Sequence, residues 1–216
     1  MHQNAAAENN SRKSDARLES ERAILTAAES VFAEFGFKGA TTALIAERAG
    51  LPKANLHYYF PTKESLYRRV VDRIFRIWLE AARSFDDCDD PAQAISRYVA
   101  KKMEISRDYP NGSKIWASEI MMGGPVMQDY LETTLREWTQ SRIDIIDRWI
   151  AEGRVRAING RYLLYLIWAA TQHYADFGHQ IATLNGGEPL DDAQFCDAQD
   201  TLIGIILRGI GINQSG

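Results

Sequence analysis

Hydrophobic residues in this chain recur at steps of three and four positions, the spacing that places them on one buried face of an α-helix. The first such series follows Glu21 and predicts a helix that ends at Gly36, a residue type common at helix C-termini. Its apolar members are Ile24, Ala27, Ala28, Val31, Phe32 and Phe35. This regular stripe predicts a packed helical domain at the front of the chain.

Two short helices are predicted next, joined by a tight turn. Thr41 or Thr42 can cap the first helix, which is closed by Gly50. Pro52 fits the first position of the second helix, residues 53–59, because its fixed φ and missing N–H carry no penalty there. Two short helices around such a turn form a helix-turn-helix.

The rest of the chain also has helical periodicity. One long helix is predicted over residues 62–85, and further helices follow, separated by glycine, proline and asparagine. They cover residues 92–107, 112–122, 126–152, 160–184 and 191–210. Because no segment alternates with a period of two between hairpin turns, we expect an all-α protein.

Charge is distributed unevenly along this sequence. Residues 1–85 carry 13 Lys and Arg against 10 Asp and Glu, whereas the remainder carries 12 against 19. Such asymmetry indicates two modules with different partners. The acidic stretch 86–91 lies where the balance changes, and composition alone places the domain boundary there. Residues 1–16 are polar and predict a flexible arm, in which Arg12, Lys13 and Arg17 can reach a minor groove or remain solvated.

The composition excludes several classes of protein. With 216 residues, 45% hydrophobic and 25% charged, the chain is neither disordered nor collagen-like. It has no apolar run long enough to span a membrane and no leader-like N-terminus, so a cytoplasmic protein is expected. Cys88 and Cys196 stand alone, without the spacing of a disulfide framework or a zinc site, and no metal or cofactor is expected.

The second short helix has the features of a DNA-reading element. Leu56 and Phe60 are one turn apart and can face inward, which leaves the opposite side exposed. In a helix-turn-helix this second helix enters the major groove, with its N-terminal residues near the base edges. Lys53 can meet a phosphate or guanine, and Asn55 can pair with adenine. The other outward residues are Ala54, His57 and Tyr58.

Residues 36–67 resemble the DNA-binding domain of the TetR family of transcriptional regulators. The resemblance is carried by Gly36-Phe-Lys-Gly-Ala-Thr-Thr42, by Ile45-Ala-Glu-Arg-Ala-Gly-Leu51 and by Tyr58-Tyr-Phe-Pro-Thr-Lys-Glu-Ser-Leu-Tyr67. It implies a DNA-binding domain over residues 17–67 and a helical domain for effector binding and dimerisation over residues 68–216. Pro52 departs from the small capping residue that is common there, which leaves the base preference open.

The resemblance also implies which residues hold the DNA backbone. Thr42, the Tyr58-Tyr59 pair and Lys63 match positions with that role, although Tyr59 can equally be a core aromatic and Tyr67 is expected in the core. The complete set of predicted DNA-binding residues is Thr41, Thr42, Pro52, Lys53, Ala54, Asn55, His57, Tyr58, Tyr59 and Lys63.

A single helix-turn-helix touches few base pairs, so a homodimer on a palindromic operator of double-stranded DNA is expected. The last two helices are the candidates for a four-helix interface, because their apolar residues exceed one buried face. An ordinary monomer core is the alternative. The predicted interface residues are Leu163, Ile167, Tyr174, Phe177, Ile203, Ile206, Leu207 and Ile210.

Polar residues interrupt the apolar helix around residues 166–177. Trp168 and Gln172 are one turn apart and offer a stacking surface beside an amide, a combination that suits a small planar heterocycle. His173 is expected to bond Asp176 or a neighbouring helix rather than to titrate as a sensor.

This segment, with residues 77–79, 106–110 and 149–153, resembles the RutR-type subgroup of the TetR family, whose members sense uracil or thymine. That resemblance implies a pocket lined by Trp78, Trp168 and Gln172, with Tyr109 and Glu119 as further candidates. Residues 113–127 fit the subgroup only loosely, which leaves the ligand open.

The sequence therefore predicts a ligand-responsive, repressor-like DNA switch without catalytic chemistry. The alternatives are the same DNA-binding domain with a different effector, or with a redox sensor at Cys88 and Cys196. An all-α enzyme is the remaining rival, but no clustered nucleophile, phosphate loop or metal motif occurs in the sequence.

Overall fold

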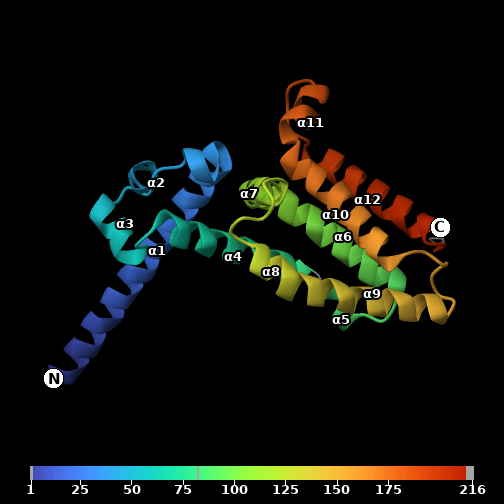
Figure 1. Ribbon diagram of the computed structural model, residues 1–216, viewed down its shortest axis with the longest axis horizontal. Helices are drawn as coiled ribbons and strands as arrows, with labels where there is room; N and C mark the ends of the chain where they lie inside the picture. The colour runs from blue at the N-terminus through green and yellow to red at the C-terminus, as the bar shows by residue number, and fades with distance from the viewer. Residues whose placement is uncertain (1, 82, 213–216) are drawn as a thin grey trace. The chain divides into compact units, whose positions relative to one another are not determined.

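The computed structural model describes residues 2–81 and 83–212, with side chains from residue 15 onward. Every regular element in these ranges is helical, as the sequence predicts (Figure 1). The helices of the first part are α1 (His2–Gly39), α2 (Thr42–Arg48), α3 (Lys53–Tyr59) and α4 (Lys63–Ala81). Those that follow are α5 (Ser84–Asp87), α6 (Pro91–Asp108), α7 (Pro110–Met121), α8 (Gln128–Tyr130), the π-helix η1 (Leu131–Leu135), α9 (Arg136–Ala151), α10 (Gly160–Asp176), α11 (Gly178–Leu184) and α12 (Asp192–Gly209).

The chain forms two compact units, Met1–Arg73 and Ile74–Gly216. The division falls inside α4, whereas the sequence placed it at residues 67 and 68, or by composition at 86–91. Helix α4 ends at Ala81 and the short α5 follows, so the single helix predicted over residues 62–85 is wrong in its last turn.

Helix α1 has a break at Gly36, where φ is 66° and ψ is 174°. A positive φ is strained for other L-residues, and glycine is the residue that tolerates it. The predicted stop at Gly36 therefore corresponds to a real change of backbone direction. The helix also extends back to His2, where the sequence predicted a flexible arm, and the side chains of Arg12 and Lys13 lie outside the described residues.

The core of the first unit joins α1, α2, α3 and α4. The apolar stripe of α1 is buried, and the ring of Phe32 meets that of Tyr67 edge to face with centroids 4.9 Å apart. Tyr67 is 3% exposed, so its expected place in the core is confirmed. Ile45 and Leu56 complete the interior from the two short helices.

Helix α6 is the centre of the second unit, where it packs against α5, α7, α10 and α12 (Figure 1). Asp90 caps α6, and Asp191 caps α12 in a capping box with Gln194. Two predicted helices are interrupted. Residues 160–184 break at Phe177, between α10 and α11, and residues 126–152 divide into α8, η1 and α9.

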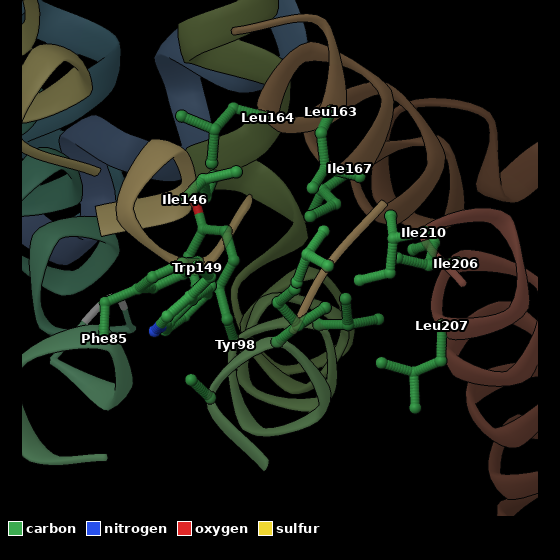
Figure 2. Close-up of a cluster of buried hydrophobic side chains, with 14 of the residues drawn as sticks. Phe85, Tyr98, Ile146, Trp149, Leu163, Leu164, Ile167, Ile206, Leu207 and Ile210 are labelled. Atoms are coloured by element: carbon green, nitrogen blue, oxygen red, sulfur yellow. The ribbon is translucent and has the colours of Figure 1, made fainter. Parts of the chain in front are cut away.

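A large hydrophobic cluster fills much of the interior of this unit. Figure 2 shows Phe85, Tyr98 and Trp149 packed with aliphatic residues from α9, α10 and α12. Phe85 and Trp149 are stacked with ring centroids 5.8 Å apart. No helix in the described part of the chain is long and apolar enough to cross a membrane.

Candidate functional site

The turn between α2 and α3 is built by residues that the sequence singled out. Thr41 caps α2, because its Oγ1 accepts a hydrogen bond from the Leu44 amide at 3.1 Å. Gly50 adopts φ 66° in the turn. Pro52 is the N-cap residue of α3, whereas the sequence predicted it at the first position inside the helix. No side chain caps α3, so its first backbone N–H groups have no side-chain acceptor at the cap.

Helix α3 has one buried side and one exposed side. Leu56 is 0% exposed and Phe60 is 7% exposed, whereas Tyr58 is 73% exposed. The other outward residues are those that the sequence predicts, Lys53, Ala54, Asn55 and His57. A short helix with a polar outer face and an anchored inner face has the form required to enter a DNA groove.

Two further predicted residues, Tyr59 and Thr42, are only partly buried. Tyr59 is half-buried and meets Tyr58 edge to face, with ring centroids 5.3 Å apart, so it takes part in both packing and the exposed surface. Thr42 is also half-buried. On the other side of α2, Arg48 holds the helix against α1 by donating to Glu34 and Ser30 at 2.8 Å each.

Lys63 serves as a brace at the start of α4. Its Nζ donates to the carbonyl oxygens of Phe37 and Ala40 at 2.7 and 2.9 Å and lies 4.6 Å from the centroid of the Phe37 ring. These contacts fix the segment that leads into α2. Because a lysine ammonium has three N–H donors, one remains for the predicted phosphate contact.

The second unit contains a cavity of about 440 Å³. Its walls come from α4, α6, α7, η1, α9 and α10. The lining residues are Phe75, Trp78, Leu79, Tyr98, Lys102, Trp116, Ala117, Ile120, Met121, Leu131, Leu135, Trp138, Trp168 and Gln172. A cavity of this size lies within the range of about 300 to 1,000 Å³ that is usual for small-molecule sites.

Four of the five tryptophans of the chain line this cavity. The rings of Trp78 and Trp116 meet edge to face at 5.3 Å, and those of Trp138 and Trp168 lie 6.3 Å apart. Flat indole faces around a cavity favour a flat, aromatic ligand.

A hydrogen bond in the cavity wall joins Trp168 of α10 to Tyr98 of α6. The indole N–H of Trp168 donates to the phenol oxygen of Tyr98 at 2.7 Å. Burial raises the pKa of Tyr98 far above its ordinary value, so the phenol stays neutral. Gln172 lies one turn beyond Trp168, and its amide makes no hydrogen bond to another described residue.

Lys102 is the one cationic residue in the cavity wall and is only 4% exposed. Its Nζ lies 4.2 Å from the centroid of the Trp78 ring, a cation–π contact worth about 2 kcal/mol when desolvated. Burial lowers the pKa of Lys102 to about 8, against the opposing attraction of Asp176. The side chain is therefore still mainly a cation at neutral pH.

The sequence reasoning missed Lys102, although a signal was available. Ile95, Tyr98, Val99 and Lys102 recur at helical spacing along the buried stripe of α6, and all four are buried. A charged residue in register with such a stripe is expensive unless it has a partner. The same spacing argument also brings Tyr98 into the wall.

The structure separates the predicted effector residues into two groups. Trp78, Trp168 and Gln172 line the cavity, whereas Tyr109 and Glu119 do not. Tyr109 is 44% exposed at the junction of α6 and α7. Glu119 is buried, and its Oε1 accepts a hydrogen bond from the Val126 amide at 2.7 Å, so the carboxylate holds the chain after α7.

His173 is expected to bond Asp176 or a neighbouring helix, and in the structure the two residues have other closest partners. Asp176 accepts a hydrogen bond from Ser113 Oγ at 2.6 Å, and His173 stacks on Phe177 with ring centroids 4.9 Å apart. Burial raises the pKa of Asp176, an effect that Ser113 and Lys102 oppose.

Most of the predicted interface residues are committed to the chain's own core. Leu163 and Ile167 of α10 belong to the central cluster with Ile206, Leu207 and Ile210, and Figure 2 shows them together. These side chains are buried within one chain, as the alternative of a monomer core expects, and their place in an interface stays a prediction. Of the others, Phe177 is 53% exposed, and Tyr174 and Ile203 are half-buried.

Helices α10 and α12 also carry large apolar residues that are exposed. Tyr162, Tyr165 and Leu166 of α10, and Phe177 directly after it, are each between 46% and 66% exposed, and Ile205 of α12 is 55% exposed. Helical spacing places the first three on one side of α10. Two adjacent turns of large exposed apolar residues are typical of an interaction surface.

The fold and these two sites define a ligand-responsive transcriptional regulator, and the chain belongs to the TetR family. Residues 24–70 match the family described as bacterial regulatory proteins of the tetR family, and residues 71–213 match the C-terminal region of YcdC-like proteins. Regulators of this family bind DNA and small-molecule effectors. They are not enzymes, which agrees with the sequence prediction.

The chain is similar to the HTH-type transcriptional regulator RutR of Escherichia coli (strain K12), with 39% identity over 189 residues, 88% of this chain and 89% of that protein. Its fold resembles that of the ketosteroid transcriptional regulator KstR2 of Mycobacterium tuberculosis, with a TM-score of 0.69, 20% identity and coverage of 90% and 95%. AibR, solved with isovaleryl coenzyme A and operator DNA, gives a TM-score of 0.69 at 16% identity, with coverage of 86% and 97%.

Proposed function

We propose that this protein is a cytoplasmic, repressor-like regulator that binds a palindromic operator as a dimer and is released by a small planar effector. The observation that carries the proposal is that one helix serves both sites. Lys63 at the start of α4 braces the segment before α2, and Trp78 on the same helix lines the cavity.

Operator binding is assigned to the exposed face of α3. Asn55 is the base-reading candidate, Lys53 can meet a phosphate or a guanine, and His57 and Tyr58 can reach the backbone or a base. Thr42, Tyr59 and the remaining donor of Lys63 are the candidates for phosphate contacts. The fixed inner residues Leu56 and Phe60 support this assignment, because a reading face is useful only when the helix beneath it is rigid.

Dimerisation is assigned to the exposed apolar face of α10 and α12. A twofold interface uses the same patch on both chains, so one exposed apolar surface suffices. Tyr165, Leu166 and Ile205 are its candidate centre. A dimer would place two α3 helices on the two halves of an inverted repeat.

The effector is proposed to be a pyrimidine such as uracil or thymine. The ring would stack on Trp168 or Trp78, and the Gln172 amide would pair with the ring's adjacent carbonyl and N–H groups. The similarity to RutR and the flat indole walls support this choice.

Release would operate through α4. A ligand that contacts Trp78 favours one setting of this helix, and the setting determines how the two α3 helices of a dimer meet successive major grooves. A coupling free energy of about 1 to 3 kcal/mol weakens operator binding by about 5- to 150-fold.

A thermal-shift panel followed by an operator-release assay tests the proposal. Uracil or thymine should raise the melting temperature, because a ligand that binds only the folded state stabilises it. The Trp168→Ala variant should still bind DNA but lose release by the effector. Release that persists unchanged in this variant would contradict the pocket assignment.

A further inference from the structure

We propose that Lys102 sets the charge of the effector, so that the cavity prefers a planar ring carrying an anionic oxygen over its neutral counterpart. This inference rests on the proposed effector role of the cavity and specifies its ligand class. The anionic oxygen can belong to a ring carboxylate or to a ring carbonyl whose neighbouring N–H has ionised.

The first observation is that Lys102 has unused donors. It is 4% exposed and lines the cavity, and its Nζ donates no hydrogen bond to any other described residue. The Trp78 ring, 4.2 Å away, covers one side of the ammonium. A buried ammonium with free N–H donors is an unfavourable arrangement that a bound anion would relieve.

The second observation is that the cavity wall contains no carboxylate. Its lining residues within the described chain are aromatic, aliphatic or amide-bearing, apart from Lys102. Asp176 is the acidic group that most influences Lys102, but it is absent from the lining and accepts a hydrogen bond from Ser113. The positive charge at the wall is therefore left for a ligand.

The third observation is the arrangement of the polar groups. Tyr98 and Lys102 lie one turn apart on α6, and Trp168 and Gln172 lie one turn apart on α10. The hydrogen bond from Trp168 to Tyr98 joins the two pairs. A ring stacked on indole can therefore present an oxygen to Lys102 while its amide edge faces Gln172, and a cavity of about 440 Å³ has room for a ring substituent.

The test is a calorimetric titration of the full-length protein with three related rings. Uracil is the neutral probe, uracil-6-carboxylate carries a carboxylate, and 5-nitrouracil has a ring N–H made acidic enough to ionise near neutral pH. We expect at least one anionic probe to bind about 10-fold or more tightly than uracil, the scale of a hydrogen bond to a charged group. The probe that does so identifies the source of the anionic oxygen.

Two variants assign the preference to Lys102. The Lys102→Met variant should lose the preference, because it should weaken the anionic probe much more than uracil, and Lys102→Arg should keep it. Lys101→Met is the matched control, because Lys101 is the adjacent exposed lysine and pairs with Glu104. Circular dichroism verifies that each variant is folded.

The outcomes separate this inference from the proposed function. If uracil binds as tightly as both anions, or if Lys102→Met weakens all probes equally, the charge-selecting role is overturned and the proposed pyrimidine effector stands. If none of the three rings binds the wild-type protein, both are overturned.

Discussion

The indole N–H of Trp168 donates to the phenol oxygen of Tyr98 at 2.7 Å, and this bond fixes the orientation of a cavity wall. Tyr98 is 2% exposed, and its ring also meets Phe85 edge to face at 5.3 Å. The bond thus connects a candidate effector-stacking residue to the central hydrophobic cluster of the second unit.

Tyr98→Phe should weaken both stability and effector binding. The change removes the acceptor and leaves the indole N–H without its partner, which should lower the free energy of unfolding by about 1 to 3 kcal/mol. Urea denaturation measures the first effect and ligand titration the second. Tyr162→Phe is the control, because Tyr162 is 66% exposed. Equal unfolding free energies for wild type and Tyr98→Phe would refute the role of this bond.

Lys102→Met should stabilise the ligand-free protein and remove a pH dependence. The pKa of Lys102 is about 8 in the folded protein, against an ordinary value of 10.5. Below pH 8 the ammonium is therefore charged in both the folded and the unfolded protein. Its burial then destabilises the folded state. Between these two pH values the folded side chain loses its proton first. The unfolded state then binds more protons, and the unfolding free energy rises with pH.

At neutral pH the gain from Lys102→Met should be at most about 3 kcal/mol, less the lost contact with Trp78. Urea denaturation between pH 7 and pH 10.5 checks both the gain and the slope. If the unfolding free energy of the wild type does not rise relative to that of the variant over this pH range, the buried ammonium does not destabilise the fold.

Lys53→Ala and Asn55→Ala should affect DNA binding in different ways. If Lys53 contacts a phosphate, its loss should weaken binding to all sequences alike. The slope of log affinity against log salt concentration should then become less steep by about one unit. Loss of a base contact at Asn55 should cost about 1 to 3 kcal/mol and relax preference at one base pair. Fluorescence anisotropy at several salt concentrations distinguishes them, with Lys101→Ala as the control. If both variants bind DNA with unaltered affinity, α3 does not contact the DNA.

Leu166→Glu should convert the proposed dimer to a monomer. A carboxylate in the centre of an apolar twofold interface is repeated on the partner and stays unpaired. Leu184→Glu is the matched control, because Leu184 is 81% exposed and lies on α11. Sedimentation velocity measures the outcome. If Leu166→Glu remains dimeric while Leu184→Glu dissociates, the interface lies elsewhere.

The sequence predicted the helices and the exposed side of α3 well, because periodicity decides both. Leu56 and Phe60 are one turn apart, and a helix that buries them must expose Lys53 and Asn55. The same logic cannot separate an interface from the core. Helices α10 and α12 are apolar on two sides, and periodicity does not tell which side meets the chain's own core. Ile167 faces that core, whereas its neighbour Leu166 is exposed.

The cavity was only partly predictable. Trp168 and Gln172 are one turn apart on one helix, so local spacing found them. Trp116 and Trp138 reach the same cavity from different helices, and only the tertiary packing brings them together. Glu119 was predicted at the effector, but its carboxylate accepts a hydrogen bond from the Val126 amide across the turn after α7, a contact that helical spacing does not indicate.

Two copies of α3 are proposed to read an inverted repeat. Selection of duplexes from a random pool by the purified protein, followed by sequencing, tests this claim most directly. We predict enrichment of an inverted repeat whose half-sites are separated by about one helical turn or a multiple of it, and loss of that enrichment in Asn55→Ala. Recovery of no common sequence, or of a single unpaired half-site, would contradict the claim.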